Sequence, residues 1–188
     1  MKPYHAIFAA LAATSIFALA SSSRAPLPPG WVVAGESPEQ YEAGVDLTQT
    51  ISGKGAKYIH NVAGDGKSWG TLMQMFSAEK YRGQRVRLRA RVKTKEVSGW
   101  AGLWMRVDVP GQRSVLYNSQ DKPIKGSADW QQRSVVLDVG PGANALAFGV
   151  IQNGSGEVWI DDVKLDVVDR TVPVDVMSRP ALPAGPTL

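Results

Sequence analysis

The chain has 188 residues, a formal net charge of +4 and no cysteine. This length suits one domain, and 44% hydrophobic with 20% charged residues is typical of a globular protein, which excludes a disordered chain and a multi-spanning membrane protein. So small a net charge lacks the dense basic footprint of nucleic-acid-binding proteins, and we expect no nucleic-acid partner. Without cysteine, stability depends on the core and not on disulfides.

The first residues have the pattern of an export signal. Lys2 precedes an uncharged apolar run over 6–20, and small residues at Ala18 and Ala20 offer a cleavage site. We predict a signal peptide over 1–25, cleaved between 20 and 25, which places the mature protein in the periplasm or outside the cell without a stable membrane anchor. The alternative is an N-terminal anchor or a buried helix.

The remaining chain predicts strands separated by Gly, Asn, Asp and Pro turns. The expected strands lie near 31–34, 41–47, 56–62, 69–76, 84–95, 99–109, 113–117, 130–138, 144–152 and 157–168, with one helix-like turn at 77–83. This pattern predicts an all-β fold, a two-sheet antiparallel β-sandwich (jelly roll) over 26–168. The Pro-rich residues 169–188 are expected to form an extended or disordered tail outside the fold.

In the strand expected at 84–95, apolar and basic side chains alternate. The apolar face is expected to face the core and consists of Val86, Leu88, Ala90 and Val92. The opposite face is basic and consists of Arg85, Arg87, Arg89, Arg91 and Lys93. This face fits either a solvated surface with cross-strand salt bridges or a surface for an anionic polymer.

The next strand carries the candidate binding site. Alternation places Ala101, Leu103, Met105 and Val107 on one face, and on the other face the candidate ligand-binding residues Trp100, Trp104, Arg106 and Asp108. The two indole rings are about 13 Å apart along a strand, with Gly102 between them. Aromatic faces with a few polar groups suit a saccharide, although a peptide or an aromatic ligand satisfies the same argument. In the alternative interpretation, the Trp face forms the core.

The sequence offers little for catalysis. His60 is the only histidine outside the predicted signal, and no nucleophile elbow, P-loop, dinucleotide fingerprint or His/Cys metal spacing is present. Asp161 and Asp162 are adjacent and are expected to point to opposite faces, so they do not form the carboxylate pair of a glycosidase. We therefore predict no catalytic residues and no enzymatic activity.

The last strand adds a resemblance to known domains. GSGEVWIDDVKLDVV (154–168), with GKGAKYI (53–59), YRGQRVRLRARVKT (81–94) and DWQQRSVVLDV (129–139), resembles jelly-roll carbohydrate-binding modules and galactose-binding-like domains. GTLMQMF (70–76), GWAGLWMRVD (99–108) and DKPIKGSADW (121–130) resemble an uncharacterised bacterial domain that also occurs attached to helix-turn-helix transcription regulators.

The resemblance also implies a metal ligand. In the jelly-roll family an Asp of the closing strand often holds a structural calcium, and the equivalent residue is Asp161, which is expected to face inward with Trp159, Val163 and Leu165. Alternatively, Asp161 accepts backbone N–H groups or pairs with an arginine.

These observations predict an exported, non-catalytic binding module for a glycan or small molecule, with carbohydrate as the first choice. The alternative is a small-molecule sensor or protein-interaction module of the cell envelope. The third hypothesis is an enzyme that acts through His60 or an unseen carboxylate pair.

Overall fold

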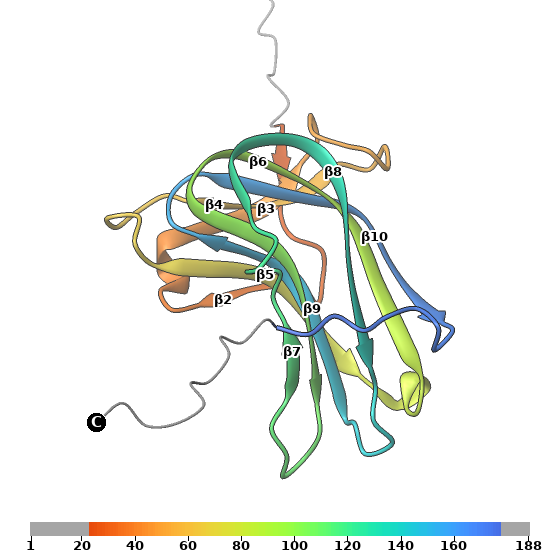
Figure 1. The fold of residues 1–188 in the computed structure, drawn as a ribbon. Coiled ribbons are helices and arrows are strands. Elements are labelled where there is room, and N and C mark those ends of the chain that lie inside the picture. The colour runs from red at the N-terminus through yellow and green to blue at the C-terminus, as the bar shows by residue number, and fades with distance from the viewer. Residues whose placement is uncertain (1–22, 178–188) are drawn as a thin grey trace, which may run out of the picture.

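The computed structural model describes residues 23–177, and β-strands dominate it (Figure 1). Its elements are, in order, β1 (Arg24–Ala25), β2 (Val32–Gly35), η1 (Pro38–Gln40), β3 (Tyr41–Asp46), β4 (Ala56–Asn61), β5 (Trp69–Ser77), η2 (Glu79–Tyr81), β6 (Arg85–Asp108), β7 (Val115–Tyr117), β8 (Ile124–Asp138), β9 (Ala145–Asn153) and β10 (Glu157–Val168). Most predicted strand boundaries are correct to within two residues. The exceptions are β6, which unites two predicted strands, and β8, which starts earlier than expected.

The strands form two antiparallel layers that are continuous through β6 (Figure 1). The first sheet has the order β1, β3, β4, β10, the first half of β6, and β8. The second has the order β7, the second half of β6, β9, β5 and β2. The predicted two-sheet antiparallel β-sandwich is confirmed.

β6 passes from the first sheet to the second through a bend. Glu96 has a left-handed backbone with φ of 53°, and the pairing of β6 with β8 changes register three times between Val92 and Ala101. Such irregularities let a strand bend while it keeps its neighbours. The bend coincides with the gap between the two predicted strands, which explains why they were predicted separately.

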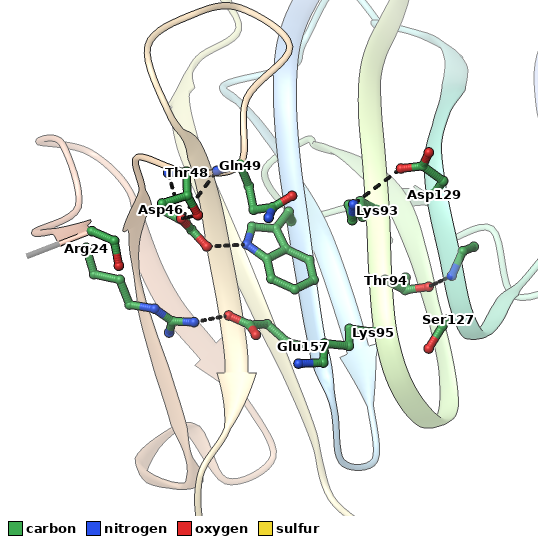
Figure 2. Close-up of a pocket in the computed structure, with 13 residues that line it drawn as sticks. Arg24, Asp46, Thr48, Gln49, Lys93, Thr94, Lys95, Ser127, Asp129 and Glu157 are labelled. Atoms are coloured by element: carbon green, nitrogen blue, oxygen red, sulfur yellow. Dashed lines mark hydrogen bonds and ion pairs between the residues drawn. The ribbon is translucent and has the colours of Figure 1, made fainter.

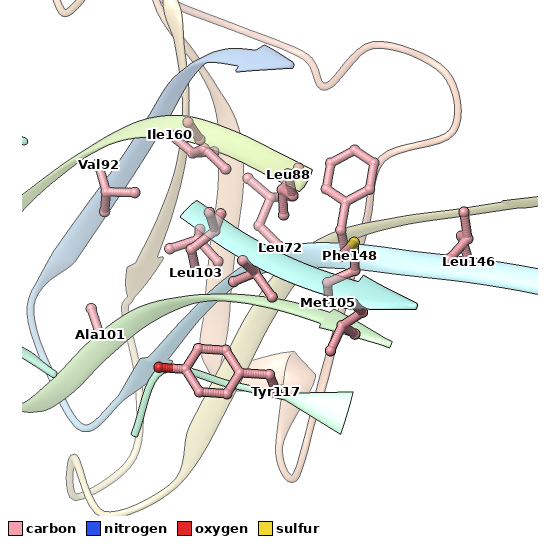
Figure 3. Close-up of a cluster of buried hydrophobic side chains, with 14 of the residues drawn as sticks. Leu72, Leu88, Val92, Ala101, Leu103, Met105, Tyr117, Leu146, Phe148 and Ile160 are labelled. Atoms are coloured by element: carbon pink, nitrogen blue, oxygen red, sulfur yellow. The ribbon is translucent and has the colours of Figure 1, made fainter. Parts of the chain in front are cut away.

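The core lies between the two sheets (Figure 3). Both halves of β6 contribute their apolar face, represented by Leu88 and Leu103, and they meet Leu72 of β5, Phe148 of β9 and Ile160 of β10. The predicted inward residues of both β6 halves are buried. The faces of β6 opposite the core therefore remain for surface functions, a basic one on the first sheet and an aromatic one on the second.

The two ends of the domain extend beyond the predicted limits of 26 and 168. Arg24 and Ala25 pair with β3, and the Arg24 guanidinium contacts the Glu157 carboxylate at 2.6 Å. After β10, the amide of Asp175 donates to the carbonyl of Val136, so residues 169–177 belong to the domain and are not a separate tail. The rest of the predicted tail, 178–188, and residues 1–22 of the predicted signal peptide lie outside the described residues.

Candidate functional site

A hollow of about 470 Å³ occupies the outer face of the second sheet. Its lining comes from β2, β5, β6 and β9, from β7, and from the segment that follows β7. Three indole rings line it, those of Trp69, Trp100 and Trp104, and we call this hollow the tryptophan cleft. Its volume is within the range of about 300–1,000 Å³ that is common for ligand sites.

Strand register places two of the rings in one row. Trp69 of β5 and Trp100 of β6 are both paired with Asn153 of β9, which lies between them. Trp69 is 36% exposed, and Trp100 is partly exposed. Since neighbouring strands are about 4.8 Å apart, two aromatic side chains flank a central amide roughly 10 Å from each other. This row can present ring faces on both sides of a polar group.

Trp104 forms the floor of the cleft. Its register partner on β9 is Gly149, and its indole N–H reaches β5, where it donates to the Thr71 hydroxyl at 2.7 Å. The Thr71 hydroxyl in turn donates to the carbonyl of Val150 at 3.0 Å. A side chain at Gly149 would collide with the backbone of Leu72 and Met73 on β5. Trp104 is only 7% exposed, so its orientation is fixed before any ligand arrives.

Arg106 provides the charged group of the cleft, and Asp108 orients it. The Arg106 guanidinium contacts the Asp108 carboxylate at 2.8 Å, and Ser114 donates a hydrogen bond to the same carboxylate. Burial acts to raise the pKa of Asp108, but the hydrogen bonds from Ser114 and Arg106 hold this pKa below its ordinary value. Asp108 stays ionised and neutralises Arg106, which leaves N–H groups that can still donate to a hydroxyl-bearing ligand.

The structure brings three of the four predicted ligand-binding residues together. Trp100, Trp104 and Arg106 line the cleft, while Asp108 lies behind Arg106 and is not part of the lining. The alternative in which the Trp face of this strand forms the core is wrong, because the core contains the opposite face, with Ala101 and Leu103.

Sequence reasoning missed the contribution of β5 to the cleft. Trp69, Thr71 and Met73 alternate on the predicted strand 69–76 and share the face that lines the cleft. This alternation could have identified the face. The pairing of β5 with β9, which brings Trp69 opposite Asn153, connects segments far apart in the sequence and is not visible in it.

Asp161 is buried, but outside the main core. A bulge in β10 between Asp161 and Lys164 changes the alternation, so Asp161 lies with Trp159 on the outer side of the sheet while Val163 and Leu165 contact the core. The expectation that Asp161 and Trp159 face inward is therefore wrong. A sequence pattern of period two cannot show such a shift.

The Asp161 carboxylate holds the loop after β3. It accepts N–H groups from Ile51 at 2.7 Å, Ser52 at 2.9 Å and Asp162 at 2.7 Å. Burial acts to raise its pKa, but these hydrogen bonds hold the pKa below its ordinary value. In the described part of the chain no group of three or more His, Cys, Asp or Glu side chains could hold a metal ion. The contacts on both carboxylate oxygens agree with the alternative of a loop anchor, and the role of Asp161 as a calcium ligand stays a prediction.

A second hollow, of about 670 Å³, lies on the outer face of the first sheet (Figure 2). Its aromatic residue, Trp159, is 4% exposed and donates its indole N–H to the Asp46 carboxylate at 3.1 Å. Lys93 pairs with Asp129 at 3.3 Å at its border. Because its ring is covered and these charges are compensated, this hollow is a weaker candidate than the tryptophan cleft.

The basic face of β6 is largely compensated across strands. Arg85 pairs with Asp138 at 2.8 Å, and Arg87 and Arg89 share Asp166 at 3.8 and 2.5 Å. These contacts agree with a solvated face that carries cross-strand salt bridges.

Several solved structures similar in fold are carbohydrate-binding modules, and another is the enzymatically active domain of bacteriophage CBA120 tailspike protein 4, with a TM-score of 0.52 at 14% identity. The CBM22-1 xylan-binding domain from Paenibacillus barcinonensis Xyn10C has a TM-score of 0.55 at 15% identity, covering 76% of this chain and 88% of that one. A xylan-binding domain from CBM 22 has a TM-score of 0.57 at 10% identity, covering 77% of this chain and 92% of that one. TmCBM61 in complex with β-1,4-galactotriose has a TM-score of 0.50 at 14% identity, covering 74% of this chain and 90% of that one. The predicted resemblance to these modules is confirmed for the fold.

Among curated proteins, the chain is similar to an uncharacterised HTH-type transcriptional regulator, YbfP of Bacillus subtilis (strain 168). The two are 37% identical over 153 residues, which cover 80% of this chain and 52% of the regulator. The chain therefore spans about half the length of this relative, and the predicted resemblance to a regulator-associated domain is confirmed. No family model matches the chain.

Within residues 23–177, no helix has the length and apolar character needed to cross a membrane.

Proposed function

We propose that this protein is an exported, non-catalytic module that binds a carbohydrate chain in the tryptophan cleft. The observation that carries the proposal is the outer face of the second sheet, where Trp69 and Trp100 flank Asn153 above the fixed ring of Trp104. Sugar rings have apolar C–H faces that pack on aromatic rings and hydroxyl groups that need polar partners, and this face offers both. The predicted signal peptide supports export.

The surroundings of His60 support the non-catalytic part of the proposal. His60 lies on β4, where its register partners are Glu42 of β3 on one side and Glu157 of β10 on the other. This position is on the first sheet, away from the tryptophan cleft. Neither neighbour is a Ser or Cys nucleophile of the kind that histidine activates in hydrolases.

The similar solved structures support a glycan as the ligand. One is described in complex with β-1,4-galactotriose, and another, a CBM22-1-GH10 fragment of Clostridium thermocellum Xyn10B, is complexed with xylohexaose. We expect this chain to bind linear oligosaccharides of that kind.

Isothermal titration calorimetry with oligosaccharides of β-1,4-linked xylose, glucose and galactose tests the proposal. We expect saturable binding that falls by about tenfold or more in Trp69→Ala and in Trp100→Ala, because each substitution removes a ring face from the cleft. Trp130→Ala is the matched control, since Trp130 packs beside Trp159 on the first sheet and should leave affinity unchanged. Absence of binding to all three series, or equal loss in Trp130→Ala, would contradict the proposal.

A small-molecule sensor is the second candidate, favoured by the similarity to a transcriptional regulator. In that case the same cleft binds a single small ligand. Thermal-shift screening of monosaccharides and aromatic metabolites would then give stabilisation that oligosaccharides do not.

A further inference from the structure

We infer that the glycan-binding surface continues beyond β7 into a second subsite whose far wall is the C-terminal segment 175–177. This inference rests on the proposed function and extends the same site. It predicts that the chain recognises several linked sugar rings, and that the rings beyond the tryptophan cleft contact residues that follow the sandwich strands.

The tryptophan cleft does not end at β7. Arg106 of β6 and Leu116 of β7 are directly paired across the two strands, and both also line an adjoining hollow of about 840 Å³. The adjoining hollow, which we call the tail hollow, is completed by Arg113, Ser114 and Val115 on one side and by 175–177 on the other. The Arg106–Leu116 pair is thus the shared border of two adjoining hollows.

The path across the sheet suits a chain of linked rings. From β2 through β5, β9 and β6 to β7 there are four gaps between strands, which span roughly 19 Å, and the tail hollow extends this path further. A monosaccharide would contact only a small part of such a surface. A linear oligosaccharide laid across the strands would reach both hollows.

The far wall is a fixed part of the domain. The Asp175 carboxylate accepts the N–H of Val136 at 2.9 Å, and the amide of Asp175 donates back to the Val136 carbonyl at 2.9 Å. Lys122 pairs with the same carboxylate at 3.7 Å, and Met177 packs against the core. The Arg85 guanidinium also donates to backbone carbonyls of the segment 169–172. A wall held at several points can contribute to binding at little cost in lost flexibility.

The chemistry of the tail hollow matches that of a sugar ring. Val115, Leu116 and Val176 present apolar surface, and Val176 is 75% exposed although Asp175 and Met177 on either side of it are anchored to the domain. Arg113 is exposed and makes no ion pair with any described residue, so its N–H groups are available to ring hydroxyls.

Calorimetry on the full chain with a trisaccharide and a hexasaccharide of β-1,4-linked xylose, glucose and galactose tests this inference. We expect one series to bind with a hexasaccharide affinity about tenfold above that of its trisaccharide. Val176→Asp and Arg113→Ala should each reduce this advantage to about twofold or less without changing trisaccharide affinity. Val167→Asp is the matched control, because Val167 is also exposed, at 55%, but lines neither hollow.

The outcomes separate this inference from the proposed function. Hexasaccharide binding that is unaffected by Val176→Asp and Arg113→Ala would overturn the subsite and leave the tryptophan cleft intact. Failure of every oligosaccharide to bind would overturn the proposed function itself. Circular dichroism of each variant shows whether the fold is retained, and Val176 is exposed enough for its substitution to leave folding unchanged.

Discussion

Trp104 has its position set by two short-range constraints. The Thr71 hydroxyl accepts the indole N–H, and β6 turns its opposite, apolar face to the core, which keeps the ring on the outer face. The result is a ring fixed on the surface of a sheet. Such preorganisation lowers the entropy cost of binding because the ring does not need to be ordered by the ligand.

Thr71→Val tests this arrangement. Valine keeps the shape of threonine but leaves the buried indole N–H of Trp104 without an acceptor, so we expect a loss of about 1–3 kcal/mol in unfolding free energy. Oligosaccharide affinity should fall as well, because the ring loses its orientation. Urea unfolding and calorimetry measure the two effects.

Thr71→Ser is the control for that prediction. It keeps the hydroxyl and should retain most of the stability and affinity. Equal behaviour of Thr71→Val and the native chain in both measurements would mean that the hydrogen bond to Trp104 has no structural role.

At the scale of strands, the period-two alternation in the sequence was enough to predict most of the fold. In β6 it assigned both faces correctly, because the register shifts of this strand are confined to the bend between Val92 and Ala101. It failed in β10, where Trp159 and Asp161 were assigned to the inward face together with Val163 and Leu165 but lie on the outer face, because the bulge after Asp161 changes the alternation. It also could not show that β5 pairs with β9, which is why Trp69 was missed. Long-range pairing and bulges depend on tertiary contacts that local pattern does not contain.

The loop after β3 depends on hydrogen bonds to the Asp161 carboxylate. Asp161→Asn replaces a carboxylate that accepts three backbone N–H groups by an amide with one acceptor oxygen, and we expect a loss of about 1–3 kcal/mol at neutral pH. The folded-state pKa of Asp161 lies below its ordinary value of 3.8. Its contribution is therefore present above that ordinary value and is lost as pH falls through the folded-state pKa.

The difference between Asp161→Asn and the native chain should accordingly shrink in acid. Chemical unfolding at about pH 7 and about pH 3 measures this trend. Addition of calcium chloride at neutral pH separates the two roles of Asp161. A rise in native stability with calcium that Asp161→Asn abolishes would contradict the loop-anchor interpretation and support a calcium site.

At the scale of the molecule, the sandwich presents two outer faces of different chemistry. The first sheet carries the basic row of β6, compensated by acidic residues of β8 and β10, and the hollow around Trp159 has its ring covered. The second sheet carries the tryptophan cleft, where the one arginine is neutralised by Asp108. One strand, β6, supplies the central row of both faces. A neutral glycan suits the second face, and an anionic polymer would need the first.

Ionic strength distinguishes these faces. Binding of a neutral oligosaccharide in the cleft should change little from about 50 to about 500 mM NaCl, because no net charge is neutralised on binding. Arg91→Gln, on the basic face, should leave this affinity unchanged, whereas Trp100→Ala should lower it by about tenfold or more at every salt concentration. An affinity that falls steeply with salt and is lost in Arg91→Gln would instead identify an anionic ligand on the first sheet. Calorimetry across the salt series, with heparin as the anionic probe, would thus assign the binding surface to one face of the sandwich.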